Sequence, residues 1–135
     1  MILRFALAGV LLTLGLAAPA SAHVPGPWAP SWDLLGSRAV SHHGEFDTIP
    51  AYGHQRYRQL KVCAYNKPIR FYDLDVVFRN GGHQDVATRL VLYPGQCTRA
   101  VDLNGHRRDI RFVRMAYETL GWNRGSRAFV RVYAR

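Results

Sequence analysis

Short runs of β-branched and aromatic residues, separated by turn residues, constrain the fold of this chain more than any other feature. The clearest turn signals are the Asn-Gly-Gly at Asn80–Gly82, the Pro-Gly at residues 94–95 and the Asn-Gly at residues 104–105. No window of about eleven residues shows the 3.6-residue periodicity of an amphipathic helix. We expect strands near residues 32–42, 46–51, 57–66, 69–79, 84–93, 97–103, 107–118 and 127–134. About eight such strands indicate an all-β sandwich or barrel, and we predict a single-domain antiparallel β-sandwich.

The N-terminus has the pattern of a secretory signal peptide. Arg4 precedes an apolar run from Phe5 to Leu16, and the small residues Ala20-Ser21-Ala22 follow. We predict a signal peptide over residues 1–22, cleaved after Ala22, because the apolar run is too short to span a bilayer comfortably. An uncleaved N-terminal anchor is the alternative. The protein is then periplasmic or secreted and not an integral membrane protein, with a proline-rich lead-in at 23–31 and the β-sandwich domain at 32–135.

Two cysteines, Cys63 and Cys97, lie 34 positions apart. In an oxidising compartment an even pair of cysteines predicts a disulfide. Two free thiols or a redox pair are the alternatives, and the chain has no Cys-x-x-Cys spacing that would favour the second.

The chain is strongly basic, and its positive charge comes mainly from arginine. Lys and Arg together number 18 against 9 Asp and Glu, and only Lys61 and Lys67 are lysines. Guanidinium groups suit bidentate contacts with phosphate, sulfate or carboxylate, and a basic surface also attracts polyanions without specificity. A compositional preference for arginine over lysine explains the same numbers, so both interpretations stay open.

Apolar residues change between odd-numbered and even-numbered positions midway along two of the expected strands, those near residues 69–79 and 107–118. In the first they are odd-numbered up to Phe71 and even-numbered from Leu74. In the second they are even-numbered up to Phe112 and odd-numbered from Val113. A β-bulge in each strand would return the apolar side chains to one face of the sheet.

The segment from Val101 to Glu118 raises the question of an anion site, because it concentrates arginines around an Asn-Gly turn. We expect a hairpin with a type I′ turn at residues 104–105, which pairs Asp102 with Arg107 and Thr98 with Arg111. Its outward arginines then have carboxylates beside them. The candidate anion-binding or buried, paired residues are Arg99, Arg107, Arg108, Arg111 and Arg114.

Two of these arginines, Arg99 and Arg108, share the parity of the apolar face of the expected hairpin. They could extend to the sandwich edge, pair with Asp73 or Asp75, or form the floor of an anion pocket. Extension to the edge or pairing with an aspartate, both of which are structural roles, is favoured over an anion pocket.

A search for catalytic or metal-binding patterns is mostly negative. There is no nucleophile elbow, phosphate-binding glycine loop or zinc-protease helix. Asp73 and Asp75 resemble paired carboxylates, but we expect them to flank a bulge and neutralise arginines, and Cys63 could be a nucleophile only if unpaired. The weak metal candidates are His42, His43, Glu45, Asp47, His54 and His83. We predict no enzyme activity, no cofactor and no metal site.

Aromatic residues near turns offer a second kind of site. An exposed row of rings on a β-sandwich would stack sugars, whereas rings in a small core with polar ends outward are commoner. The residues concerned are Tyr52, Tyr57, Tyr65, Tyr93, Trp122 and Tyr133.

Three stretches carry a family resemblance: "WDLLGSRAV" (Trp32–Val40), "YDLDVVFRNGG" (Tyr72–Gly82) and "GQCTRAVDLNGHRRDIRFV" (Gly95–Val113). Following an apparent signal peptide, they resemble a family of small exported bacterial proteins of unknown function, the YaaI-like family. The likeness covers residues 32–134, and this chain is richer in arginine than the member from which the family takes its name. The resemblance implies an exported all-β domain and no established activity.

We therefore expect an exported, non-catalytic binding or interaction module for the cell envelope. Its expected partner is an anionic glycan, a lipid head group or a protein; nucleic acid is disfavoured because export separates the two. A structural or stress-related envelope protein without a small ligand is the alternative. A carbohydrate-binding module or a hydrolase is less favoured.

Overall fold

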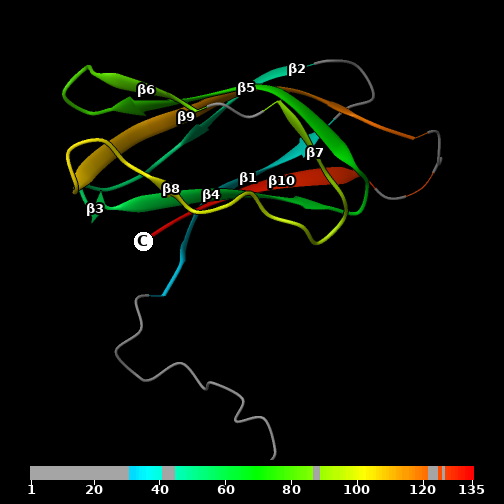
Figure 1. Ribbon diagram of the computed structural model, residues 1–135, viewed down its shortest axis with the longest axis horizontal. Helices are drawn as coiled ribbons and strands as arrows, with labels where there is room; N and C mark the ends of the chain where they lie inside the picture. Colours follow the sequence, from blue (N-terminus) through cyan, green and yellow to red (C-terminus); the bar gives the residue numbers. More distant parts are fainter. Residues whose placement is uncertain (1–30, 41–44, 87–88, 122–124, 126) are drawn as a thin grey trace, which may run out of the picture.

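The computed structural model describes residues 31–40, 45–86, 89–121, 125 and 127–135. Every regular element in this part of the chain is a β-strand, and the strands form two antiparallel sheets. Figure 1 shows the two sheets as stacked layers. The predicted all-β sandwich is therefore confirmed. The signal peptide, the lead-in up to residue 30, His42, His43 and Trp122 lie outside the described residues.

The first sheet has four strands, in the order β1-β10-β4-β8. They are β1 (Asp33–Val40), β10 (Ala128–Ala134), β4 (Gln59–Tyr65) and β8 (Val101–Asp102). Strand β10, near the C-terminal end of the chain, is thus inserted between β1 and β4 by pairings remote in sequence.

The second sheet has six strands, with β2-β9-β5-β6 as its main order. β3 also pairs with β9, and β7 pairs with β5. The bounds are β2 (Glu45–Pro50), β3 (Arg56–Tyr57), β5 (Ile69–Phe78), β6 (His83–Val86), β7 (Leu90–Leu92) and β9 (Arg108–Thr119).

The core lies between the sheets and takes alternate side chains from each strand. β4 and β10 contribute small and branched residues, whereas β5 and β9 contribute larger ones such as Phe78 and Tyr117, both nearly inaccessible. Gly36 of β1 packs closely against Ile49 of β2. A Cβ atom at Gly36 would lie 2.5 Å from Ile49 Cγ2, so a larger residue there would force the two strands apart.

Both predicted bulges are present, one of them shifted. In β5 the register against β9 slips between Phe71 and Asp73, as the parity change predicts. In β9 the extra residue is Arg111, because Val77 pairs with Phe112 and Phe78 with Ile110. Phe112 is therefore half-buried on the outer surface of the sheet and not in the core, where its parity had placed it.

The predicted hairpin around residues 104–105 is wrong. β8 pairs with β4, whereas β9 pairs with β2, β3 and β5, so the Asn-Gly turn connects the two sheets. Positive φ angles do occur there, at Gly105 and His106. A chain reversal does occur, but the type I′ turn expected at residues 104–105 is not formed, because Asn104 lacks a positive φ angle. Both long edges of β9 are occupied by strands of the six-stranded sheet, and β8 has its partner in the other layer.

The predicted disulfide is present between Cys63 and Cys97. It joins β4 to the segment that leads into β8, and Thr98 reinforces this junction by accepting a hydrogen bond at Oγ1 from the Val62 amide, at 3.1 Å. The disulfide therefore holds the edge of the four-stranded sheet, where only two residues of β8 form regular pairs with β4.

Removing the disulfide should lower the free energy of unfolding. A 34-residue separation corresponds to roughly 3.5–4 kcal/mol in the loop-entropy relation. Denaturation in urea of the double variant Cys63→Ala/Cys97→Ala checks the value, with reduced wild type as the matched control. Labelling of both cysteines in the native protein, or identical unfolding of oxidised and reduced protein, would contradict the pairing.

Candidate functional site

The outer face of the four-stranded sheet concentrates cationic and aromatic side chains. Alternation along the central strands, interrupted in its burial pattern at the disulfide-bonded Cys63, places Leu60 and Val130 in the core and directs Lys61 and Arg131 outward. We call this surface the cation–aromatic face. It comprises Trp32, Lys61, Tyr65, Arg131, Tyr133 and Arg135.

The cations of this face lie against aromatic rings. Lys61 Nζ is 4.5 Å from the centroid of the Trp32 ring and 5.6 Å from that of Tyr133. The Cζ atom of Arg135 is 4.5 Å from the Trp32 centroid. At such distances the ring quadrupole attracts the cation and restricts its motion.

A second cation–aromatic pair continues the same surface. Arg131 Cζ is 4.6 Å from the centroid of the Tyr65 ring, and the hydroxyls of Tyr65 and Tyr133 are 3.1 Å apart. The register places Arg131 opposite Cys63 and Tyr133 opposite Lys61, so these contacts cross neighbouring strands. These contacts connect the six side chains in a series, which runs from Arg135 through Trp32, Lys61, Tyr133 and Tyr65 to Arg131.

Neighbouring side chains on this face shift the pKa values of Tyr133 and Arg131. The hydrogen bond with Tyr65 lowers the pKa of Tyr133, burial opposes this, and the nearby Arg131 and Lys61 lower it further. The Tyr133 hydroxyl in turn raises the pKa of Arg131. Arg131 and Tyr133 thus stabilise each other's charged forms.

No carboxylate neutralises these three cations within the described residues. β4 and β10 contain no Asp or Glu, and every ion pair identified uses a carboxylate of β5 or β9. On that other sheet Arg70 pairs with Glu118 at 3.0 Å and Arg79 pairs with Asp109 at 3.1 Å. Ion pairs of arginine among the described residues are thus confined to the six-stranded sheet, although Arg108 and Arg111 of that sheet also lie against rings without a carboxylate partner.

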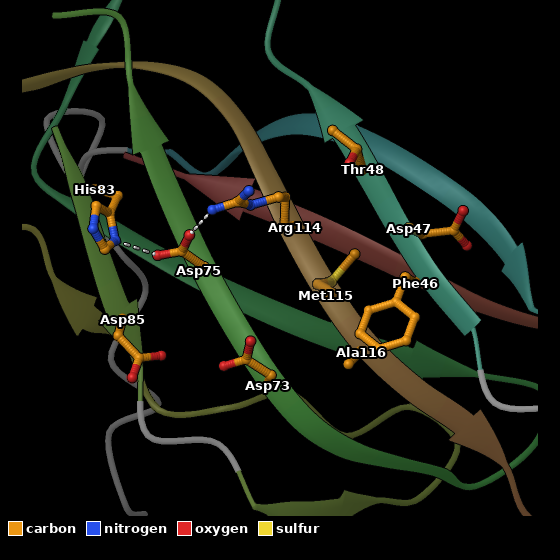
Figure 2. Close-up of a pocket in the computed structure, with 10 residues that line it drawn as sticks. All are labelled: Phe46, Asp47, Thr48, Asp73, Asp75, His83, Asp85, Arg114, Met115 and Ala116. Atoms are coloured by element: carbon orange, nitrogen blue, oxygen red, sulfur yellow. Dashed lines mark hydrogen bonds and ion pairs between the residues drawn. The ribbon is translucent and has the colours of Figure 1, made fainter. Parts of the chain in front are cut away.

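The six-stranded sheet carries a groove of about 470 Å³ on its outer surface, shown in Figure 2. Asp75 is its centre and is almost buried, since Arg114 donates to one carboxylate oxygen and His83 Nδ1 lies 3.1 Å from the other. Asp73 and Asp85 also line the groove. The prediction that Asp75 neutralises an arginine is borne out by this contact with Arg114.

The groove has part of the geometry needed for acid–base chemistry. A carboxylate that orients a histidine is the base half of a hydrolytic triad. However, no Ser, Thr or Cys side chain hydrogen-bonds to His83 in the described part of the chain. The groove therefore presents a histidine in contact with a carboxylate, without an activated nucleophile among the described residues.

The predicted metal candidates are dispersed. His54 lies 3.3 Å from Asp109, His83 contacts Asp75, and Asp47 accepts a hydrogen bond from the buried Tyr117 hydroxyl. No group of three or more His, Cys, Asp or Glu residues is placed to hold a metal ion among residues with described positions.

Arg108 connects two turns and does not contact Asp73 or Asp75. Its guanidinium carbon lies 3.6 Å from the centroid of the Phe78 ring, and it donates to the Asn104 carbonyl at 2.8 Å and to Asn80 Oδ1 at 3.3 Å. This contact supports the structural role expected for Arg108.

The other predicted arginines do not converge on one site. Arg99 and Arg107 are exposed. Arg111 and Arg114 approach Phe112 at 5.7 and 5.8 Å, and Arg114 also binds Asp75. The proposed row of arginines beside carboxylates on a hairpin is thus replaced by separate contacts.

The aromatic residues predicted as sugar-stacking candidates also separate. Tyr57 is buried, and Tyr52 and Tyr93 are exposed elsewhere, whereas Tyr65 and Tyr133 meet on the cation–aromatic face. Sequence reasoning missed Trp32, Lys61, Arg131 and Arg135 as partners of these tyrosines. The signal was the alternation of Lys61 with Tyr65, and of Arg131 with Tyr133, in two strands that lack acidic residues.

Comparison with known protein families assigns the chain. The family described as Domain of unknown function (DUF2541) matches residues 6–134. The protein belongs to this family. No curated protein and no solved structure matches the chain. Within the described residues, no helix is long and apolar enough to cross a membrane.

The Asp75 contacts predict a specific pH dependence of stability. Burial raises the pKa of Asp75, but Arg114 and His83 outweigh burial and hold that pKa below its ordinary value. A depressed folded-state pKa contributes stability that is fully present above the unfolded value of about 3.9 and is lost as the pH falls through the folded value. Asp75→Asn should therefore lower the unfolding free energy by about 1–2 kcal/mol at neutral pH, and by progressively less in acid.

Urea denaturation over a series of pH values measures this difference. Asp73→Asn is the matched control, because the Asp73 side chain is exposed and forms no ion pair with another described residue. An equal loss in both variants, or a loss that persists unchanged below the folded pKa, would contradict the assignment.

Proposed function

We propose that the protein is an exported, non-catalytic binding module that holds an anionic partner of the cell envelope on its cation–aromatic face. The observation that carries the proposal is the presence of three cations, Lys61, Arg131 and Arg135, that contact aromatic rings and have no carboxylate partner among the described residues.

Aromatic contact makes these cations suitable for recognition. A guanidinium that lies over a ring keeps its N–H edges available for a bidentate contact with carboxylate, phosphate or sulfate. Ring contact also restricts the long side chain before binding, which reduces the entropy lost when the anion is bound. An arginine already in an ion pair, such as Arg70, would first have to release Glu118.

Export is supported by the signal-like N-terminus, with cleavage after Ala22, and by the Cys63–Cys97 disulfide, which suits an oxidising compartment. The motifs that resemble the YaaI-like family support the same location. An extracytoplasmic location favours an anionic glycan, lipid head group or protein over nucleic acid as the partner.

The alternative is a structural envelope protein in which the cation–aromatic contacts only stabilise the sheet surface. This alternative predicts that substituting the cations changes stability and no binding property. A hydrolase is less favoured because His83 lacks a nucleophile among its described contacts.

Binding to immobilised dextran sulfate at about 150 mM salt tests the proposal, since loose charge attraction between exposed groups is largely screened there. The triple variant Lys61→Gln/Arg131→Gln/Arg135→Gln should bind at least about tenfold more weakly, because one charge-assisted contact contributes about 1.5–3 kcal/mol.

The matched control is Arg70→Gln/Arg89→Gln/Arg111→Gln, which removes the same charge from the region of the six-stranded sheet and should bind like wild type. Equal losses in the two triple variants would show that net charge alone drives binding. Absence of binding by wild type at this salt concentration would favour the structural alternative.

A further inference from the structure

A second groove, of about 720 Å³, begins where the cation–aromatic face ends. Arg135 belongs to both surfaces: its guanidinium approaches the Trp32 ring, and the residue also lines this groove. Arg135 Nε donates to Gln59 Oε1 at 2.7 Å, and Gln59 is a further lining residue. We call this hollow the end groove; its other lining residues are Arg58, Asp102, Leu103, Gly105 and His106.

The end groove extends the polar, mainly basic character of the face. Arg58 and His106 are exposed in it, and each can donate hydrogen bonds to an anion. The one acidic side chain in its lining, that of Asp102, accepts a hydrogen bond from Gln59 Nε2 at 2.8 Å. Donor groups therefore extend from Arg131 along the central strands of the sheet to the turn at Gly105.

We propose that the partner is a linear anionic polysaccharide whose chain lies along the cation–aromatic face and continues into the end groove. This inference rests on the proposed function and specifies the ligand class of the same surface.

The dimensions of the face favour a chain over a small anion. The face runs from Tyr65, which pairs with Phe129, to Arg135, six positions further along the chain, which corresponds to roughly 20 Å of extended chain. Outward side chains recur about every 7 Å along a strand, so the cations present a spaced series of positions and not one concentrated site. Successive anionic groups of a polymer would occupy these positions together, as a multivalent ligand does.

The shape and chemistry of the surface favour a sugar chain over a bilayer. A flat membrane surface cannot follow the face into a concave groove. The rings of Trp32, Tyr65 and Tyr133 are only half-buried and lie between the cations, so that they offer apolar surface and hydroxyl groups to the sugar units that separate the anionic groups.

Calorimetric titration with oligogalacturonides, from the dimer to the decamer, tests this inference on the full mature protein. Affinity should rise at least about tenfold between the tetramer and the octamer, and then level off once the chain occupies both face and groove.

The variant Arg58→Gln/His106→Asn should weaken binding of the octamer by about fivefold or more and leave binding of the tetramer unchanged. Asn suits position 106 because His106 has a φ of 69°, which Asn tolerates. The control Arg89→Gln/His54→Asn removes the same residue types outside the end groove and should change neither affinity. Thermal unfolding of each variant confirms that it remains folded.

The outcomes separate this inference from the proposed function. If the dimer binds as tightly as the octamer, or if the groove variant binds the octamer normally, the extended-chain inference is wrong while anion binding stands. If phosphatidylglycerol vesicles bind and no oligosaccharide does, the ligand is a membrane and the inference is equally overturned. If neither these probes nor dextran sulfate bind at about 150 mM salt, the proposed function fails as well.

Discussion

Burial of alternate side chains between two sheets is the constraint on which the rest of this structure depends. A slip of one residue in β4 or β10 would exchange the core residues with the outward ones, so the core fixes which side chains reach the surface. Leu60 and Val130 are inaccessible, and their neighbours Lys61 and Arg131 must therefore face outward. The cation–aromatic face is a direct consequence of the register that forms the core.

Among the described residues, ion pairs of arginine are confined to one layer of the sandwich. On the six-stranded sheet, Arg70, Arg79 and Arg114 lie beside carboxylates, so their charge supports local structure. On the four-stranded sheet, Arg131 and Arg135 lie over aromatic rings with no carboxylate on the two central strands. The basic composition alone could not show where arginines lack carboxylate partners; the absence of ion pairs on the central strands of the four-stranded sheet is the basis of the proposed binding surface.

The elements governed by local sequence were predictable, and those governed by remote pairing were not. Alternation predicted most strand positions and both bulges, and cysteine content predicted the disulfide. The Asn-Gly turn at residues 104–105 predicted a change of direction correctly but not the layer in which the chain continues, because that depends on which strand edges are already occupied. The face was missed for the same reason: β4 and β10 are far apart in the sequence, and only their pairing brings Tyr65 beside Arg131.

Mapping of the bound surface by NMR tests the central claim most directly. Octagalacturonate added to the ¹⁵N-labelled mature protein at about 150 mM salt should shift the amides of Lys61, Arg131 and Tyr133 and the indole N–H of Trp32 most strongly. Amides around Asp75 on the opposite sheet should stay in place. The largest shifts on the six-stranded sheet, or small shifts spread over all exposed arginines, would contradict a binding site on the cation–aromatic face.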